Sequence, residues 1–267
     1  MCGMYPAVEL FGRVIGAYTI LATAGYLVMG VWACYTARKR GHDDNDMIFL
    51  LLVAAVGALL GAHILYGALH WDLLLQAVDG LLQGAGLALF GQRLSAVFGG
   101  AVFYGGLAGG LLAGFFCAYK KRLPLPEYAD MLSPAIPLFH VFGRIGCFLG
   151  GCCYGVPSGF GVLYTHALVP EANWVRRFPV QLAESAYNLL LFFLLAHLLK
   201  RNMLKGRLLP LYLLLYALGR FALEFWRGDA GRGFVGALSV SQCISALIIV
   251  AAGLFLAATR QGRSKRD

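Results

Sequence analysis

Hydrophobic residues run through this chain in long blocks separated by short polar segments, not in the alternating pattern of a half-buried strand. A block of about 20 apolar residues is long enough to cross the hydrocarbon core of a bilayer as an α-helix. We therefore predict an all-α, polytopic transmembrane helical bundle. Its seven predicted spans are residues 10–36, 47–69, 96–118, 128–151, 180–199, 207–226 and 236–259.

The segment between the second and third spans has a different pattern. Residues 72–94 carry Asp72, Asp79 and Arg93 among many leucines, which is typical of an amphipathic stretch that lies in the membrane interface. No polar block is long enough for a large soluble domain. We therefore expect residues 1–267 to form a single integral membrane domain.

Composition agrees with this interpretation and limits the possible partners. The chain is 60% hydrophobic and only 13% charged, whereas about a quarter of the residues in a soluble domain are charged. The net charge of +9 would suggest nucleic acid as a partner in a soluble protein. Here the basic residues cluster at the ends of apolar blocks, and no module combines them with stacking aromatic residues, so we expect no nucleic acid.

The distribution of basic residues predicts an orientation. The clusters within residues 38–40, 120–122, 200–207 and 260–266 all fall on one side of a seven-span bundle, and far fewer basic residues fall on the other. Because basic loops stay in the cytoplasm, the C-terminus is predicted to be cytoplasmic and the N-terminus outside. The expected location is the bacterial inner (cytoplasmic) membrane, with several passes.

Five charged residues lie at positions in the predicted spans from which the bilayer should exclude a charge: Arg13, Arg144, Glu184, Arg220 and Glu224. A charge at the bilayer centre costs about 3 kcal/mol on insertion scales, so such residues face the bundle interior and pair. Arg220 and Glu224 are four residues apart and share one helical face. They form either a closed internal ion pair or part of a polar cavity in which an arginine is available to a ligand.

Phosphate is the ligand that suits an arginine inside a membrane. The planar guanidinium donates two parallel hydrogen bonds to phosphate oxygens and stays charged. The most available phosphate at this depth belongs to a lipid headgroup. Two arginines on different helices are expected to hold a phosphodiester and to stabilise charge on a leaving phosphate.

The segment at residues 143–155, Gly-Arg-Ile-Gly-Cys-Phe-Leu-Gly-Gly-Cys-Cys-Tyr-Gly, resembles the signature of the prolipoprotein diacylglyceryl transferase family, G-R-[IL]-G-N-F-x-N-G-E-x-[WY]-G. Three further elements follow the family's order: H-G-G, H-P-x-Q-x-x-E and R-[FI]-x-x-E-F-x-R. A closing S-x-x-Q-x-x-S is also similar. The positions that match are Gly105, Gly106, Gly143, Arg144, Gly146, Phe148, Gly151, Tyr154, Gly155, Pro179, Gln181, Glu184, Arg220, Phe221, Glu224, Phe225, Arg227, Ser239, Gln242 and Ser245.

The resemblance implies a seven-helix inner-membrane enzyme. Such an enzyme moves a diacylglyceryl group from phosphatidylglycerol, or a related anionic phospholipid, to the thiol of the lipobox cysteine of a prolipoprotein. By resemblance Arg144 and Arg220 bind the phosphate, and Glu224 orients Arg220. The other expected substrate-binding positions are Gly105, Gly106, Gly143, Gly146, Gly151, Gly155, Gln181, Glu184, Arg227 and Gln242. Membrane lipids and prolipoproteins are the expected partners.

The chain departs from the family pattern at four polar positions. The family's two histidines are replaced by Tyr104 and Phe178, its asparagine by Cys147 and its signature glutamate by Cys152. Tyr104 is a poor base at neutral pH, because the pKa of tyrosine is about 10. His140, four residues before Arg144, is a possible substitute, and so is a purely structural role for that histidine.

The glycine pairs of the third span also have two interpretations. Small residues such as Gly105 and Gly106 let membrane helices approach closely. They also leave room for a lipid tail or headgroup beside the helix.

Three of the seven cysteines crowd together as Cys147, Cys152 and Cys153. They are small residues that fill space, or nucleophilic or acceptor thiols beside Arg144, or a redox or soft-metal site. The C-x4-C-C spacing is not that of a zinc ribbon, so zinc is not expected. We expect no cofactor. A different acceptor on the same scaffold, or a thiol-redox or metal-handling membrane protein, is the alternative function.

Overall fold

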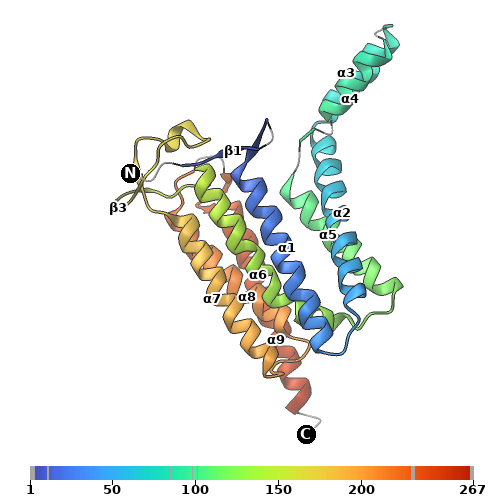
Figure 1. Cartoon of the computed structure of the whole chain (residues 1–267), viewed down its shortest axis with the longest axis vertical. Helices are drawn as coiled ribbons and strands as arrows, with labels where there is room; N and C mark the ends of the chain where they lie inside the picture. The colour runs from blue at the N-terminus through green and yellow to red at the C-terminus, as the bar shows by residue number, and fades with distance from the viewer. Residues whose placement is uncertain are drawn as a thin grey trace. The chain divides into compact units, whose positions relative to one another are not determined.

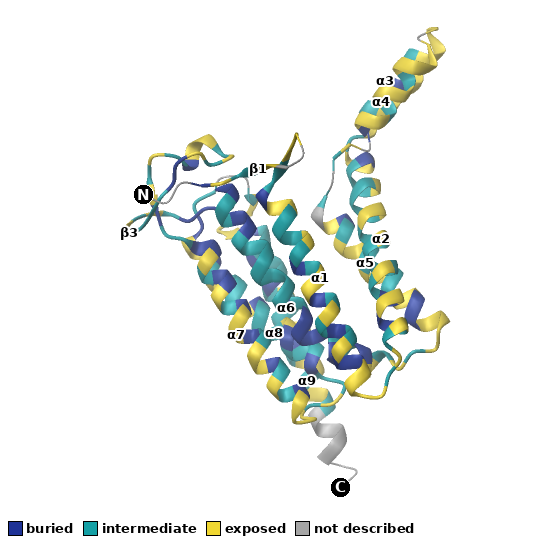
Figure 2. Cartoon of the chain, in the orientation of Figure 1, coloured by how far each residue is buried: buried dark blue, intermediate teal, exposed yellow. Residues whose placement is uncertain are grey.

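The computed structural model describes residues 4–264 except positions 11, 85, 98, 101, 230 and 231. Cys2, Lys265 and Arg266, which entered the sequence predictions, lie outside the described residues, as do the side chains of Arg260 and Arg263. Six of the described helices are long and apolar enough to cross a membrane. Many of their large apolar residues are exposed, and a lipid-facing surface accounts for this exposure. Figure 2 shows exposed residues, in yellow, along the length of these helices. The chain is therefore a polytopic helical membrane protein.

The chain forms two compact units. One unit combines the residues up to Thr36 with those from Pro126 onward, and the other is formed by Ala37–Leu125. All of the intramembrane charges discussed above belong to the first unit, and Tyr104 and the glycine pairs belong to the second.

The first unit is a helical bundle with small hairpins at one end. In Figure 1, α1 (Ala17–Lys39), α6 (Leu125–Gly150), α7 (Val180–Lys200), α8 (Leu208–Leu223) and α9 (Val240–Ser264) run side by side. A short 3-10 turn, η2 (Glu224–Trp226), follows α8. The core between α7 and α8 is built from Leu191, Leu195, Leu199, Leu208 and Tyr212.

Three antiparallel two-stranded pairs complete this unit. They are β1 (Ala7–Leu10) with β2 (Arg13–Gly16), β3 (Pro157–Leu163) with β4 (Arg176–Arg177), and β5 (Phe234–Val235) with β6 (Leu238–Ser239). The second pair and the turn η1 (Pro170–Ala172) belong to the long loop between α6 and α7. The side chain of Arg177 stabilises this loop, because it donates hydrogen bonds to the backbone oxygens of Ala172, Gly155 and Glu171.

The second unit contains α2 (Asp44–Leu69), α3 (Trp71–Leu82), α4 (Leu87–Val97) and α5 (Phe103–Lys120). The segment expected to lie in the interface forms α3 and α4, whose 12 and 11 residues are too few to span a bilayer. Helices α2 and α5 pack at close range through glycine. A Cβ added at Gly105 would lie 2.3 Å from the backbone oxygen of Gly61, and one at Gly109 would lie 2.2 Å from that of Gly57.

The structure corrects the starts of three predicted spans. The first helix begins at Ala17, not at residue 10, because Gly12, with φ of +73°, closes the β1–β2 hairpin ahead of it. Arg13 therefore lies exposed on β2, outside the helix in which we predicted an intramembrane charge. The third predicted span begins as a helix at Phe103 and the last at Val240, since the β5–β6 hairpin precedes α9.

Candidate active site

One buried carboxylate pairs with two arginines, and the three residues come from three different helices. Glu184 on α7 accepts from Arg144 on α6 (Nε to Oε2, 2.5 Å) and from Arg220 on α8 (Nη1 to Oε1, 2.7 Å). Glu184 is only 4% exposed, so its charge has little contact with solvent. A buried carboxylate of this kind is stable only when it is paired, and here it bridges two cations from different helices.

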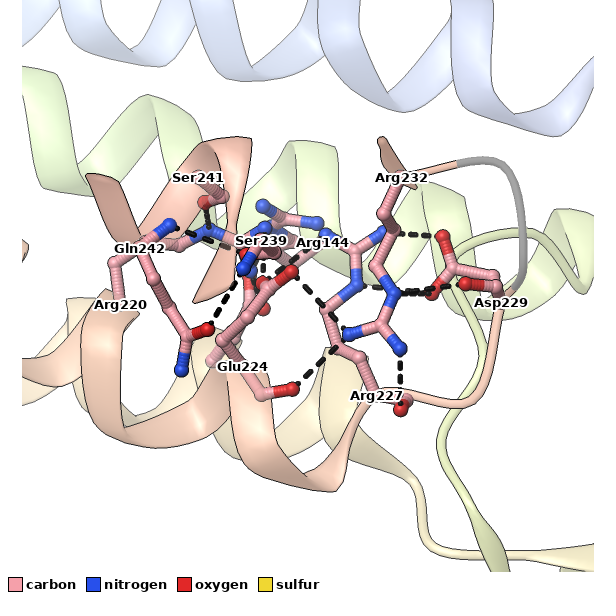
Figure 3. A network of polar contacts seen from close by, with 10 residues as sticks. Arg144, Arg220, Glu224, Arg227, Asp229, Arg232, Ser239, Ser241 and Gln242 are labelled. Atoms are coloured by element: carbon pink, nitrogen blue, oxygen red, sulfur yellow. Dashed lines mark hydrogen bonds and ion pairs between the residues drawn. The ribbon is translucent and has the colours of Figure 1, made fainter. Parts of the chain in front are cut away.

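Arg220 is held on three sides (Figure 3). Besides Glu184, its Nη2 lies 2.7 Å from Oε2 of Glu224 one turn further along, and its Nε donates to Oγ of Ser241 on α9 at 2.9 Å. Every nitrogen of this guanidinium has a partner. Arg220 is therefore fixed in orientation by two carboxylates and a hydroxyl.

The network continues into the loop after α8. Arg227 makes a bidentate pair with Asp229, with distances of 2.9 and 2.6 Å, and Arg232 lies 3.3 Å from Oε1 of Glu224. Figure 3 shows these loop residues gathered around the end of α8. Burial lowers the pKa of Arg227, but the hydrogen bonds and charges of Asp229 and its neighbours outweigh burial and raise it above the usual value. Arg227 therefore stays charged.

This network carries more positive than negative charge. Its arginines are Arg144, Arg220, Arg227 and Arg232, and its carboxylates are Glu184, Glu224 and Asp229, so one positive charge is unbalanced. Within the part of the chain that the structure describes, Arg144 has only its Nε paired, and its side chain is 20% exposed. The two terminal nitrogens of Arg144 thus form a free fork that suits a phosphate.

Two glutamines expected at the site are buried nearby with defined partners. The side chain of Gln181 donates to the backbone oxygen of Cys152 at 2.8 Å and accepts from the hydroxyl of Tyr164 at 3.0 Å. Gln242 and Ser239 exchange hydrogen bonds of 3.0 and 3.1 Å at the start of α9, which is a capping box. The similarity at the closing motif thus has a structural explanation in the N-terminus of α9.

The three cysteines converge where α6 ends. Gly151 takes a left-handed conformation (φ +69°), Cys153 does likewise (φ +53°), and the Sγ atoms of Cys147, Cys152 and Cys153 lie within 4.8 Å of one another. The hydrogen bond with Cys147 lowers the pKa of Cys152, but that with Cys153 and burial raise it to about 11. Hydrogen bonds with the other two thiols, helped by Arg227 and Arg144, lower the pKa of Cys153 despite its burial.

The glycines of the signature have different local surroundings. Gly151 and Gly155 have no room for a side chain, because an added Cβ would lie 2.2 Å from Ala167 Cβ and from Phe178 O respectively. Gly146 faces α1, where a Cβ would come within 3.0 Å of Tyr18. Gly143 faces open space, with nothing within 4 Å of an added Cβ. Three of the four thus have a packing role.

His140, the candidate substitute base, lies in an aromatic setting on α6. Its Nδ1 lies 3.3 Å from the hydroxyl of Tyr212, and its ring is 5.1 Å from that of Tyr216. In the second unit, Tyr104 is 48% exposed on α5. Gly105 and Gly106 both face α2, where added Cβ atoms would lie 2.3 Å from Gly61 O and 3.2 Å from Ala58 O. Close helix packing explains both glycines.

Sequence reasoning missed Asp229 and Arg232 as members of the site. Both follow Arg227, the last position of the R-[FI]-x-x-E-F-x-R element, within a short polar loop. The signal that identifies them is the dense alternation of opposite charges directly after a span that already ends in Glu224 and Arg227.

Comparison with known proteins gives a consistent result. The sequence model of the family described as prolipoprotein diacylglyceryl transferase matches residues 6–258. A protein of Clostridium tetani named phosphatidylglycerol–prolipoprotein diacylglyceryl transferase is 31% identical over 250 residues, covering 93% of this chain and 94% of that protein. Similar proteins of the same name occur in Clostridium perfringens (31% over 244 residues, 91% and 90% covered) and Finegoldia magna (30% over 246 residues, 92% and 91% covered).

Proposed function

Because the chain belongs to the prolipoprotein diacylglyceryl transferase family, a family of membrane enzymes, we propose that it transfers a diacylglyceryl group from phosphatidylglycerol. The acceptor is the thiol of the lipobox cysteine of a prolipoprotein, and glycerol phosphate is the second product. A related anionic phospholipid is the alternative donor.

The observation that carries this proposal is the state of the arginine network. The two terminal nitrogens of Arg144 form a free fork, and the network as a whole has one unbalanced positive charge. A phosphodiester has a single negative charge, and it would complete the charge balance of the whole network of four arginines and three carboxylates described above. The cost of burying a charge inside a bilayer favours such compensation. A neutral or zwitterionic headgroup would leave the excess charge in place.

The chemistry follows from this placement. The thiolate sulfur attacks the terminal glycerol carbon of the diacylglyceryl group, a C–S bond forms, and the C–O bond to the phosphate breaks. The electron pair leaves on the phosphate oxygen, where Arg144, with Arg220 held rigid by Glu184 and Glu224, stabilises the new charge. Prearranged donors of this kind lower the barrier because they need no reorganisation during the reaction.

Other residues have supporting roles in this proposal. Gln181 and Arg227 line the polar region, and Gly143 leaves open space beside Arg144 for the headgroup. His140 and Tyr104 remain the candidate bases that accept the proton of the acceptor thiol. Gly146, Gly151, Gly155, Gly105 and Gly106 act through packing, and Gln242 through the cap of α9.

We also propose that the protein lies in the bacterial inner membrane as one integral domain with seven spans, its N-terminus outside and its C-terminus cytoplasmic. The α5 helix supplies the seventh span in this arrangement. The basic clusters at residues 38–40, 120–122 and 200–207 support this orientation.

The test uses the full chain reconstituted in vesicles that contain labelled phosphatidylglycerol, with a lipobox peptide as acceptor. We expect glycerol phosphate release that falls by about 10²-fold or more in Arg144→Ala and in Arg220→Ala, as for removal of a donor that stabilises developing charge. The matched control is Arg201→Ala, at the exposed end of α7. Equal turnover with phosphatidylethanolamine, or full activity in both variants, would contradict the proposal.

A further inference from the structure

Three sulfur atoms lie together beside the arginine network. The Sγ atoms of Cys147, Cys152 and Cys153 are mutually within 4.8 Å. The turn that ends α6 creates this arrangement, because Gly151 and Cys153 both adopt positive φ and bring the following thiols back over the last turn of the helix. The amide of Cys152 donates to the carbonyl of Cys147 at 3.1 Å, which fixes that turn.

The arrangement is held from two further sides. Gln181 on α7 is 1% exposed and donates to the carbonyl of Cys152 at 2.8 Å. Arg144 and Arg227 both interact electrostatically with Cys153. Metal ions bind cysteine as the thiolate, so an ion that binds here would release the protons of these thiols.

Three thiolates, with no fourth ligand grouped with them among the described residues, match a particular kind of metal site. Zn²⁺ is tetrahedral, and catalytic zinc sites have three protein ligands and one open position. With Zn–S bonds of about 2.3 Å, the sulfurs of such a site are about 3.8 Å apart, so the thiols need to contract by about 1 Å at most. The C-x4-C-C spacing differs from that of zinc ribbons because a helix end, not a ribbon turn, brings the ligands together.

We propose that Cys147, Cys152 and Cys153 bind one Zn²⁺ ion, and that the open fourth position of this ion takes the acceptor thiol. This inference rests on the proposed transferase function. It supplies a way to deprotonate the acceptor in a chain that has Tyr104 and Phe178 at the two positions where the family pattern that it resembles has histidine. A thiol that coordinates a metal ion is deprotonated outright.

The proposed reaction balances in atoms and electrons. The acceptor proton passes to water when the thiol binds. The zinc-bound sulfur then attacks the glycerol carbon, the C–O electron pair leaves with glycerol phosphate, and zinc does not change its oxidation state.

The cysteine cluster also lies close to Arg144, the proposed phosphate contact, which is where the acceptor thiol must bind. Arg144 is three residues before Cys147 on α6, and Gln181, which holds Cys152, is three residues before Glu184 on α7. Both pairs are neighbours on one helical face. The metal and the phosphate-binding fork are therefore adjacent along two helices.

The first test is metal binding by the full-length protein in detergent, reduced and stripped with a chelator, then titrated with Co²⁺ as a spectroscopic substitute for Zn²⁺. We expect about one ion per chain, visible bands of tetrahedral cobalt and sulfur-to-cobalt charge transfer, all displaced by Zn²⁺. Cys152→Ser and Cys153→Ser should each weaken binding about 10-fold to 100-fold or more. Cys243→Ser, a cysteine of α9 outside the cluster, should leave binding unchanged.

Several outcomes would overturn the metal site. These are no cobalt or zinc binding by the reduced protein, unchanged binding in both cysteine variants, or binding of copper(I) alone, since three-coordinate copper leaves no open position. Circular dichroism of each variant separates loss of a ligand from loss of the fold.

The second test separates this inference from the transferase function. Adding a lipobox peptide to the cobalt protein should strengthen the sulfur-to-cobalt bands, and a peptide with Ser in place of Cys should not. Transfer by chelated protein at the full rate would overturn the zinc role and leave the transferase standing. A peptide-dependent cobalt spectrum without any turnover would support the thiol site and count against the proposed donor.

Discussion

Arg144 and Arg220 are two intramembrane arginines with different surroundings. Arg220 is engaged by Glu184, Glu224 and Ser241, whereas Arg144 is held only through its Nε by Glu184. The first is thus a fixed positive charge, and the second has a fork available for a ligand. Because of this difference we propose that Arg144 makes the direct contact with the phosphate and that Arg220 supplies the supporting charge.

The fork geometry of Arg144 leads to a prediction. Arg144→Lys keeps the charge but removes the planar pair of donors, so we expect kcat/KM to fall by about 10-fold to 100-fold with the fold unchanged. The measurement is turnover in phosphatidylglycerol vesicles at several donor densities. Arg201→Lys is the matched control, and full activity of Arg144→Lys would mean that charge alone is needed.

The sequence permitted part of this site to be predicted. The pairing of Arg220 with Glu224 follows from their separation of four residues on one helix. The pairing of Arg144 with Glu184 does not, because it depends on how α6 and α7 pack side by side. Asp229 and Arg232 were missed for the same reason, since a loop that folds back over a helix end has no periodic signal.

At the scale of elements, glycine determines how α2 and α5 pack. An added Cβ at Gly57 would lie 2.3 Å from Ala113 Cβ, and one at Gly61 would lie 2.3 Å from Gly105 O. Backbones this close can be formed only by small residues, as in other membrane helix pairs. Close helix packing was one of the two interpretations of the glycine pairs in the sequence, which did not identify α2 as the partner.

Gly109→Ala tests this contact. The new Cβ would lie 2.2 Å from Gly57 O, so the helices must separate, and we expect a loss of about 1–3 kcal/mol of stability. The matched control is Gly253→Ala on α9, where nothing lies within 4 Å, and which should be neutral or slightly stabilising. Thermal unfolding in detergent measures both. Equal melting temperatures of the two variants would show that the contact is not needed.

Asp130 on α6 supports the start of α8. Its carboxylate accepts from the amides of Gly206 at 2.5 Å and Leu208 at 2.9 Å, and it is 6% exposed. The first amides of a helix have no partner within the helix, and a negative charge there is favourable. We therefore expect Asp130→Ala to lower the free energy of unfolding by about 1–3 kcal/mol.

Thermal unfolding in detergent also checks this prediction. Asp130→Asn, which keeps one acceptor oxygen, should have an intermediate effect, and Asp79→Ala on the exposed face of α3 should have none. Stability of Asp130→Ala equal to that of the unmodified protein would remove the capping role.

The hairpins mark where element prediction from sequence was wrong. Hydropathy extended the first span back to residue 10, yet β1 occupies Ala7–Leu10 and β2 occupies Arg13–Gly16. Short hairpins rich in Val, Ile and Leu have the same local hydropathy as a helix end, and only the turn at Gly12 distinguishes them. The long helices were predicted well, because an apolar block of about 20 residues has few possible structures other than a helix.

At the scale of the whole molecule, the arrangement of basic loops predicts an orientation that can be measured. We expect a green fluorescent protein fused after the last residue to fluoresce, because a cytoplasmic C-terminus lets it fold there. A fusion of alkaline phosphatase at the same point should be inactive, and one placed in the loop around residue 168 should be active. The reverse pattern would contradict the proposed orientation.

The central claim is that the arginine network serves transfer of a diacylglyceryl group to a thiol. The most direct test is mass spectrometry of the lipobox peptide after incubation with the purified chain and phosphatidylglycerol, with glycerol phosphate counted in the same reaction. The account predicts a thioether-linked diacylglyceryl group on the peptide cysteine and glycerol phosphate in equal amounts, with both products reduced by about 10²-fold or more in Arg144→Ala. An unmodified peptide, or glycerol phosphate release without peptide modification, would contradict the account.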